Sequence, residues 1–413
     1  MDLYLYGLLL FFAAISAEPT GNMKPLGEQR KSEGHIDVTE DAPDVQTFFE
    51  KYIAGSRPIV FKGAAKNMPA FKKWNDEYLK EHFGELQVDV EEGKKENRSL
   101  SMWRWPFKKF LETYQKEDVY MVHSLEEKMR GDLRLFPSLS CGGYTRVLND
   151  VVMWFSSGGT KSVLHNDHID NVNCLFSGSK QLYMVDWKHR EFIDIDAPNG
   201  AFSKVDVDAV DLDKYPGIAK APWWEANMVA GDCLFIPSRW FHQVRSFTDN
   251  KRNMAVNVWF YHMQKLNLTD CEKNQDAGKY VPLDKFKFGD LESARYVLKL
   301  ELQDGPLHVR KMTGRIKAHI GAVASKAEIK EVLSMLDRDG DKMVTMEELD
   351  NLTEDDLTVL SRMFPGLERA VSEEENGGEE GGEDQEGGVG MEGEEGDEDL
   401  GEDESLEPER EEL

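Results

Sequence analysis

The segment Leu164-His165-Asn166-Asp167-His168-Ile169-Asp170 decides how the rest of the chain is interpreted. It lies within residues 153–187, whose short apolar runs predict β-strands rather than helix. In an extended strand, side chains two residues apart point to the same face, so His165 and Asp167 are expected to share one. One imidazole and one carboxylate are two of the three ligands in the facial triad that binds non-haem Fe(II).

Two other interpretations of this segment are open. A single His-x-Asp pattern is usually an ordinary surface pair, and His168-Ile169-Asp170 repeats the pattern on the opposite strand face. A facial triad also needs a third, distant histidine. The segment Gly231-Asp232-Cys233-Leu234-Phe235-Ile236-Pro237-Ser238-Arg239-Trp240-Phe241-His242 offers His242 for that role. His189 and His262 have no ligand-like spacing and are expected to be ordinary histidines.

Two further motifs, Arg57-Pro58-Ile59-Val60-Phe61 and Gly178-Ser179-Lys180, flank the His-x-Asp segment in the chain. In this order the four motifs resemble the Jumonji-C (cupin-like) 2-oxoglutarate- and Fe(II)-dependent oxygenases, in particular the small protein hydroxylases. The resemblance implies a mainly β fold, the double-stranded β-helix (jelly-roll or cupin fold) with flanking helices, over residues 38–265.

The same resemblance implies the residues of the site. It assigns Fe(II) to His165, Asp167 and His242, and it favours His165 over His168 because Lys180 follows His165 at the family's spacing. Trp240 is expected to shield the site from water. The residues implied for 2-oxoglutarate are Lys180, Asn257, Ser162, Asn171 and Tyr120. The alternative for Lys180 is a solvated lysine in a turn.

The activity implied by the resemblance is hydroxylation of a protein side chain, using O₂ and converting 2-oxoglutarate to succinate. A second hypothesis is a calcium-binding interaction protein of the endoplasmic reticulum (ER) lumen whose β-domain has lost turnover. Neither hypothesis names the substrate.

The pattern along the chain predicts where the elements lie. Strands are expected at 57–63, 86–90, 119–122, 151–155, 162–165, 172–177, 181–185, 228–237 and 254–262. Helices are expected at 44–53, 72–83, 107–114, 291–302, 308–320 and 326–336. A small all-α domain over residues 286–370 would therefore follow the β-domain.

Residues 337–348 of that helical region resemble the twelve-residue EF-hand loop. The expected Ca²⁺ ligands are Asp337, Asp339, Asp341, the Met343 carbonyl, Thr345 and the bidentate Glu348. Lys342 occupies position 6, where glycine is usual, so binding is expected to be weakened but not abolished. EF-hand loops usually occur in pairs. The candidate for a second loop, Gln303-Asp304-Gly305-Pro306, lacks the residues that would bind Ca²⁺. The alternative is a charged turn between two helices.

Both ends of the chain indicate a compartment. Residues 3–15 are apolar and precede small residues, which is typical of a cleaved signal peptide over residues 1–17. Arg410-Glu411-Glu412-Leu413 resembles the lysine-aspartate-glutamate-leucine ER-retrieval signal. The expected location is therefore the ER lumen, with secretion as the alternative and an ER-retrieval receptor as a partner. Three sequons, at Asn97, Asn267 and Asn351, would permit glycosylation.

Charge and cysteine content limit the remaining possibilities. The formal net charge is −28, and residues 373–413 carry −20 of it, which predicts a disordered acidic tail that serves solubility or diffuse calcium binding. No basic surface for nucleic acid is expected, and no membrane insertion. Four cysteines are too few for a disulfide framework in a chain of this length, and Cys174 and Cys233 are expected to be buried apolar residues.

Overall fold

The computed structural model describes residues 21–94, 102–195, 201–263, 265–289 and 326–363, with short stretches between them (295, 298–299, 301–302, 305–312 and 314). The predicted signal peptide, the acidic tail and the sequon at Asn97 lie outside the described residues. The chain divides into two units, residues 1–377 and residues 378–413, and all described residues belong to the first unit. No helix in the described part is long and apolar enough to cross a bilayer.

Two sheets form the β-rich part of the described chain. The larger is mixed, with the strand order β2-β3-β13-β9-β15-β8-β6-β4-β5, and only its β2–β3 pair is parallel. The smaller sheet has the order β12-β10-β14 and is antiparallel. The larger sheet consists of β2 (Asp37–Thr39), β3 (Ile59–Phe61), β4 (Gln87–Glu92), β5 (Trp103–Pro106), β6 (Val119–Ser124), β8 (Leu148–Ser156), β9 (Asp170–Ser177), β13 (Cys233–Ile236) and β15 (Asn253–Phe260); the smaller consists of β10 (Ser179–Val185), β12 (Trp224–Val229) and β14 (Phe241–Phe247).

An apolar interior lies between the two sheets, because alternate residues of each strand point the same way. One buried cluster joins Leu175 and Ala255 of the larger sheet to Leu182 and Met228 of the smaller. Residues in step with these, such as 171 and 173 on β9, 180 on β10 and 257 on β15, therefore face the same interior. This two-sheet arrangement is consistent with the predicted jelly-roll fold.

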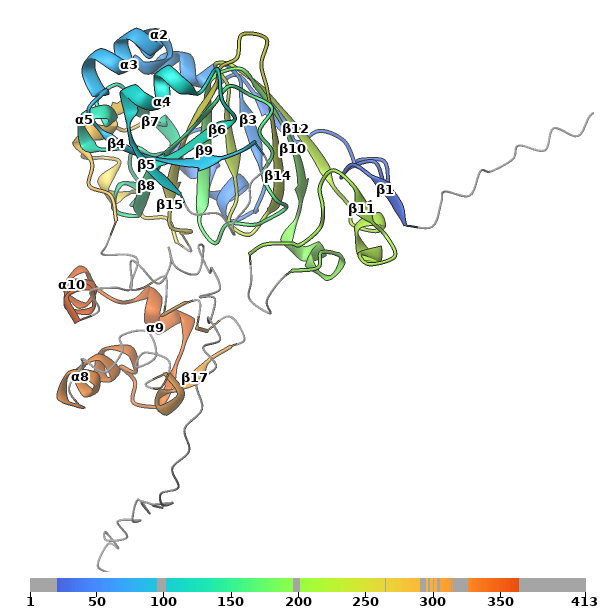
Figure 1. Cartoon of the computed structure of the whole chain (residues 1–413). Helices are drawn as coiled ribbons and strands as arrows, with labels where there is room; N and C mark the ends of the chain where they lie inside the picture. The colour runs from blue at the N-terminus through green and yellow to red at the C-terminus, as the bar shows by residue number, and fades with distance from the viewer. Residues whose placement is uncertain are drawn as a thin grey trace, which may run out of the picture. The chain divides into compact units, whose positions relative to one another are not determined.

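The other face of the larger sheet packs against helices. Because both faces of this sheet are buried, its central strands are nearly continuous apolar runs. Phe48, Phe107 and Phe110 of the helices share one buried cluster with Phe235 and Val256 of the sheet. In Figure 1, α2 to α5 gather on one side of the β-structure, and β10, β12 and β14 lie on the other. The helices are α1 (Val45–Phe48), which continues as the π-helical η1 (Phe49–Ile53), α2 (Ala70–Lys73), α3 (Asp76–Phe83), α4 (Phe107–Thr113) and α5 (Glu127–Arg130).

Short elements complete the β-rich part. The 3₁₀ turns are η2 (Ala64–Asn67), η3 (Pro137–Leu139), η4 (Tyr144–Arg146), η5 (Trp187–Phe192), η6 (Pro216–Ala219), η7 (Leu268–Asp270) and η8 (Leu283–Lys285). Two-stranded pairs join β1 (Asn22–Lys24) to β11 (Val210–Asp211) and β7 (Arg134–Leu135) to β16 (Val281–Pro282).

A tight turn at Gly178 takes the chain from one sheet to the other and delivers Lys180 to the interior. Gly178 has a positive φ of 81°, and a Cβ there would lie 2.4 Å from Asn253 Nδ2 and 2.6 Å from the Phe247 carbonyl oxygen. Only glycine fits this turn without displacing its neighbours. The Gly178-Ser179-Lys180 motif is therefore a structural requirement of the β9–β10 connection.

All four cysteines are paired, so the expectation that Cys174 and Cys233 are simple buried apolar residues is wrong. They are buried, but they form a disulfide between neighbouring strands β9 and β13, with a Cα–Cα distance of 4.0 Å. Cys141 pairs with Cys271. The close approach of directly opposed strand residues makes such pairing feasible, and sequence spacing alone does not reveal it.

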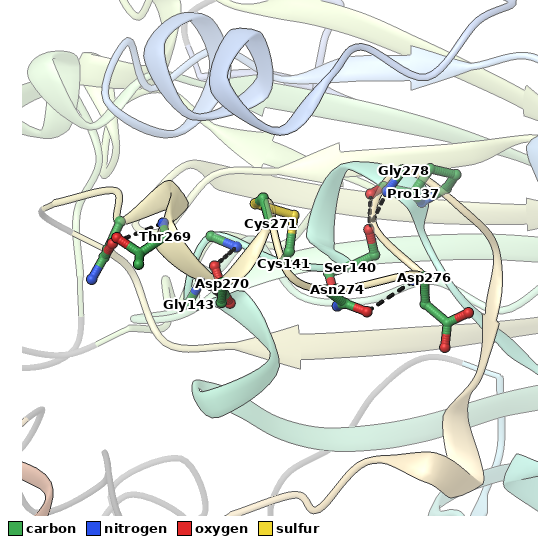
Figure 2. The surroundings of a disulfide bond; sticks show 12 residues. Pro137, Ser140, Cys141, Gly143, Thr269, Asp270, Cys271, Asn274, Asp276 and Gly278 are labelled. Atoms are coloured by element: carbon green, nitrogen blue, oxygen red, sulfur yellow. Dashed lines mark hydrogen bonds between the residues drawn. A yellow bond between two sulfur atoms is a disulfide. The ribbon is translucent and has the colours of Figure 1, made fainter.

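Figure 2 shows how the Cys141–Cys271 disulfide fastens residues beyond 265 to the β-rich part. The Asp270 carboxylate accepts hydrogen bonds from the Gly142 and Gly143 amides at 2.8 and 3.2 Å. Leu283 joins the buried cluster of the helix-covered sheet face, so this segment extends the same core. The sequon residues Asn267 and Asn351 are exposed.

The helical part, described by itself, has its own apolar cluster. Helices α8 (Lys326–Leu336), α9 (Met346–Asp350) and α10 (Glu354–Met363) surround buried Leu336, Leu349 and Leu360. The predicted helix 326–336 is confirmed, whereas the helix predicted from His308 is wrong at its start. His308 belongs to β17 (Leu307–His308), which pairs with β18 (Met343–Val344), so backbone pairing overrides the helical pattern there.

Other local predictions needed correction. The helix predicted over 72–83 is interrupted at Trp74. A new helix begins after Asn75, whose side chain accepts a hydrogen bond from the Tyr78 amide. The strand predicted over 228–237 is two strands separated at Gly231, whose φ is 105°. Residues 162–165 form isolated bridges rather than a strand.

Candidate metal centre

The main chain brings His165 and His242 together. The His165 amide donates to the His242 carbonyl at 3.1 Å, and the His242 amide donates to the His165 carbonyl at 2.6 Å. His242 lies on β14, and β14 is held in the smaller sheet by its antiparallel pairing with β10. The expectation that the His-x-Asp pair sits within a regular strand is wrong, because this segment makes only isolated bridges. It is the pairing to His242 that orders it.

Both imidazoles present the same nitrogen to the site. Nδ1 of His165 lies 3.0 Å from the Val163 carbonyl oxygen, and Nδ1 of His242 lies 2.9 Å from that of Trp240. A carbonyl can only accept, so Nδ1 carries the proton and Nε2 keeps its lone pair in each neutral ring. This is the orientation that metal-binding histidines need.

Asp167 completes the cluster predicted from the sequence. Asp167 Oδ1 lies 3.9 Å from His165 Nε2, and Asp167 Oδ2 lies 3.7 Å from His242 Nε2. Ligand atoms of the three residues lie within 4.8 Å of one another. Burial, followed by the neighbouring His165, lowers the pKa of His242 to about 4, so its ring is neutral at physiological pH. Two imidazoles and one carboxylate are the donor set that a non-haem Fe(II) site requires.

The competing pair His168 and Asp170 is placed elsewhere. The Asp170 carboxylate is fully buried and accepts from the Ser238 amide at 2.7 Å and from His262 Nδ1 at 2.9 Å. His262 lies outside the three-residue cluster and pairs with Asp170, a contact that its sequence spacing did not indicate. Burial lowers the pKa of His262 and the Asp170 carboxylate raises it, and the balance lies above the usual value.

Lys180 projects into the interior between the sheets, so it is not a solvated turn lysine. Its side chain is buried, and Nζ donates to Ser246 Oγ at 3.0 Å. Burial lowers the pKa of Lys180 to about 8, which leaves the ammonium mostly protonated at neutral pH. A buried cation is costly unless an anion accompanies it, so this position suits a carboxylate ligand.

Three asparagines share the interior with Lys180. Asn171 and Asn257 are the predicted residues; the third is Asn173, which the sequence analysis missed and whose amide donates to Asn257 Oδ1. Oδ1 of Asn171 and Oδ1 of Asn173 are buried and accept no hydrogen bond from a described residue. Buried oxygens without donors are exceptional in folded proteins, so these two are candidates to accept hydrogen bonds from a polar ligand or from water. The two-residue spacing from Asn171 was the signal that would have identified Asn173.

Ser162 and Tyr120 fit less closely. The Ser162 hydroxyl donates to the Val163 carbonyl at 3.0 Å and accepts from the Val244 amide at 2.9 Å, so it is engaged with the backbone. Tyr120 is half-buried on β6, on the interior side, with its ring centroid 6.0 Å from that of Trp154. The structure brings Tyr120 toward the interior but gives Ser162 a structural role.

Two aromatic residues border the three ligands. Trp240 is buried, and its indole N–H donates to the backbone oxygen and hydroxyl of Ser56, both at 3.0 Å. Phe202, which the sequence analysis did not single out, stacks on His165 with centroids 5.7 Å apart and an interplanar angle of 10°. Phe202 therefore covers one face of His165 with apolar surface, whereas the Trp240 indole packs against Trp224 and Trp240 reaches the predicted site through its backbone carbonyl at His242.

A second acidic cluster lies in the helical part. Ligand oxygens of Asp337, Asp339 and Asp341 lie within 4.8 Å of one another, and the buried Asp337 Oδ1 accepts no hydrogen bond from the described part of the chain. The Glu348 carboxylate accepts from the Arg338 amide and from the Thr345 amide, both at 3.0 Å. Of the other predicted ligands, Met343 lies in β18 beside His308.

The β-rich part of the chain is similar in sequence to known proteins. Residues 45–265 match a family model described as a cupin-like domain. The chain is 24% identical to "Jumonji C domain-containing protein 5" of Drosophila melanogaster over 273 residues, 60% of this chain and 65% of that protein. It is 27% identical to mouse "tRNA wybutosine-synthesizing protein 5" over 260 residues, 56% of this chain and 80% of that protein.

A human protein, "Bifunctional peptidase and (3S)-lysyl hydroxylase JMJD7", is 23% identical over 267 residues, 54% of this chain and 84% of that protein. Several relatives are longer than the match, and the chain spans between half and two thirds of their length. The names of these similar proteins refer to different substrates, so similarity alone does not select one.

Proposed function

Since the chain belongs to the cupin-like domain family, we propose that it is a 2-oxoglutarate- and Fe(II)-dependent oxygenase that hydroxylates a protein side chain. JmjC members of this family are typically oxygenases of that kind. The observation that carries the proposal is the convergence of His165, Asp167 and His242, with both Nε2 atoms turned to the site.

The residues present fit the metal and its cosubstrate. His165, Asp167 and His242 would hold Fe(II), and Lys180 would bind the distal carboxylate of 2-oxoglutarate. When bound, these groups supply the oxidation of a substrate C–H bond by O₂, coupled to decarboxylation of 2-oxoglutarate. The chain itself orients the ligands through backbone pairing, and Phe202 shields one face of His165 from water.

Protein is the proposed substrate class, with the ER lumen as the proposed compartment. Two disulfides that use all four cysteines support an oxidising location. A nucleic-acid substrate is unfavourable because phosphate binding requires basic surface, and residues 1–372 still carry a net charge of −8 when the acidic tail is left out. A retrieval receptor stays a predicted partner.

Turnover of 2-oxoglutarate in the presence of lumenal proteins provides the first test. The purified full chain is incubated with Fe(II), O₂, 2-oxoglutarate and a lumenal protein extract, and succinate is measured for wild type, His165→Ala and Asp167→Ala. His189→Ala serves as the control, since His189 stacks on Phe192 away from the ligands. We expect succinate from wild type and the control only. Succinate from the ligand variants would contradict the oxygenase proposal, and none from any form would favour the interaction-protein alternative.

A calcium site is proposed as a second function, supported by the loop geometry. Lys342 has a positive φ of 67°, which is the conformation required at position 6 of an EF-hand loop. Thr345 caps α9 in a reciprocal box with Glu348, and β18 within the loop pairs with β17 as a second loop would. Calorimetric titration of the full chain with Ca²⁺, against Glu348→Gln, tests it. Loss of one binding event in the variant is expected, and unchanged binding would rule out this loop.

A further inference from the structure

The segment that carries Asp167 has no regular strand to hold it, so other contacts must fix this carboxylate. His165 is held by two backbone hydrogen bonds to His242. Asp167, two residues later, has lost that pairing. The turn Pro237–Arg239, which connects β13 to β14, lies against the segment instead.

Three hydrogen bonds join this turn to the Asp167 segment. The Arg239 amide donates to the Asp167 carbonyl at 2.6 Å. The Ser238 hydroxyl donates to the His168 carbonyl at 2.8 Å, and the Ser238 amide donates to Asp170 Oδ1 at 2.7 Å. Arg239 has a φ of 67°, a conformation that non-glycine residues rarely adopt and that persists only when surrounding contacts stabilise it.

Asp170 connects the turn to the larger sheet. It is fully buried at the start of β9, and its second oxygen accepts from His262 Nδ1, just beyond the end of β15, at 2.9 Å. A buried carboxylate is tolerated only when its oxygens are satisfied. Here both are satisfied, one by the turn and the other by the histidine. Removing either contact would leave part of a buried charge unpaired.

We propose that Asp170 and His262 are positioning residues that hold the Ser238–Arg239 turn, and through it the backbone of Asp167, in the geometry that binds the metal. The inference rests on the proposed metal centre. Neither residue touches the metal or the cosubstrate, so the expected effect is on the affinity and geometry of the ligand set. Outer partners of metal ligands typically change metal affinity by about 10- to 100-fold.

The test compares His262→Asn with His262→Leu in the full chain. Asparagine presents an amide donor near the position of Nδ1, whereas leucine presents none. Metal binding is measured by anaerobic calorimetry with Fe(II), and the melting temperature of each metal-free variant is recorded. We expect His262→Leu to weaken Fe(II) binding by about tenfold and His262→Asn to restore much of it. Ser238→Ala, which removes only the bond to the His168 carbonyl, should weaken binding less.

The outcomes separate the two proposals. If wild type does not bind Fe(II), the metal centre itself is refuted, and the positioning role with it. If wild type binds and His262→Leu binds equally well, the positioning role alone is refuted. If His262→Leu unfolds, Asp170→Asn is measured instead, and wild-type affinity in that variant refutes the role. A loss of affinity in His262→Leu that His262→Asn does not recover would also contradict it.

Discussion

His165 and His242 form a reciprocal backbone pair, in which the amide of each residue donates to the carbonyl of the other at 3.1 and 2.6 Å. Two ligands that are far apart in the sequence are therefore aligned by the main chain. The Nδ1 atom of each histidine faces the carbonyl oxygen two residues before it, Val163 for His165 and Trp240 for His242. The two histidines of the proposed ligand set are thus ordered by the fold itself.

This order predicts that a ligand side chain can be removed without loss of the fold. His165→Ala keeps the backbone pair and should reduce Fe(II) affinity at least 100-fold, because one of three protein ligands is gone. The melting temperature of the metal-free protein should change little, since the side chain is partly exposed. Calorimetry and thermal unfolding check both parts. A large drop in melting temperature would show that the imidazole supports the fold, contrary to this prediction.

The buried ammonium of Lys180 predicts a pH dependence of stability. Burial lowers the pKa of Lys180 to about 8 in the fold, against an ordinary value of 10.5. Between these values the unfolded chain binds more protons at this residue, so the free energy of unfolding should rise with pH, by up to about 3 kcal/mol.

Urea unfolding of wild type and Lys180→Met across this window checks it, because other titrating groups cancel in the comparison. The variant should lack the rise attributed to Lys180, and it should also bind 2-oxoglutarate more weakly. Parallel curves for the two proteins would show that the ammonium is not perturbed by burial.

Lys342 predicts a calcium affinity below the usual range. Its φ of 67° imposes a strain of about 1 kcal/mol on a residue with a Cβ, and its charge opposes the cation. Lys342→Gly should tighten Ca²⁺ binding by about 5- to 10-fold, since both effects are removed. Lys342→Ala removes the charge and keeps the Cβ, so it should give a smaller gain. Equal affinities in the two variants would exclude a contribution from backbone strain.

The disulfides predict that the denatured protein has no free thiol. The Cys141–Cys271 and Cys174–Cys233 pairs close loops with sequence separations of 130 and 59 residues. Chain entropy then suggests stabilisation of about 5 and about 4 kcal/mol. Thiol alkylation in denaturant, followed by mass spectrometry, counts the free cysteines. Paired Cys→Ala variants should melt at lower temperature, and detection of free Cys174 and Cys233 in wild type would contradict the pairing.

The sequence predicted that His165, Asp167 and His242 cluster and that Lys180 accompanies them, because all four occur in motifs whose spacing is tied to the fold. Gly178 illustrates this, since its turn requires glycine and places Lys180 in the interior. The match of the cupin-like model to residues 45–265 confirms the coarse family assignment. Metal, cosubstrate and calcium roles of the individual residues stay predictions.

Features that depend on contacts across the fold were not predicted. The disulfide partners Cys174 and Cys233 become neighbours only once β9 pairs with β13. The partnership of Asp170 with His262 likewise depends on where β15 ends. His308 lies in a helical pattern, yet pairing with Met343 places it in a strand. Periodicity reports local preference, and these contacts override it.

The most direct test of the oxygenase proposal is to follow the atoms of O₂. The protein is supplied with Fe(II), 2-oxoglutarate, a lumenal protein extract and ¹⁸O₂, and the succinate formed is analysed by mass spectrometry. An oxygenase of the proposed kind places one oxygen atom of O₂ in succinate, so singly labelled succinate is expected from wild type and none from Asp167→Ala. Unlabelled succinate, or labelled succinate in equal amount from Asp167→Ala, would contradict the proposal.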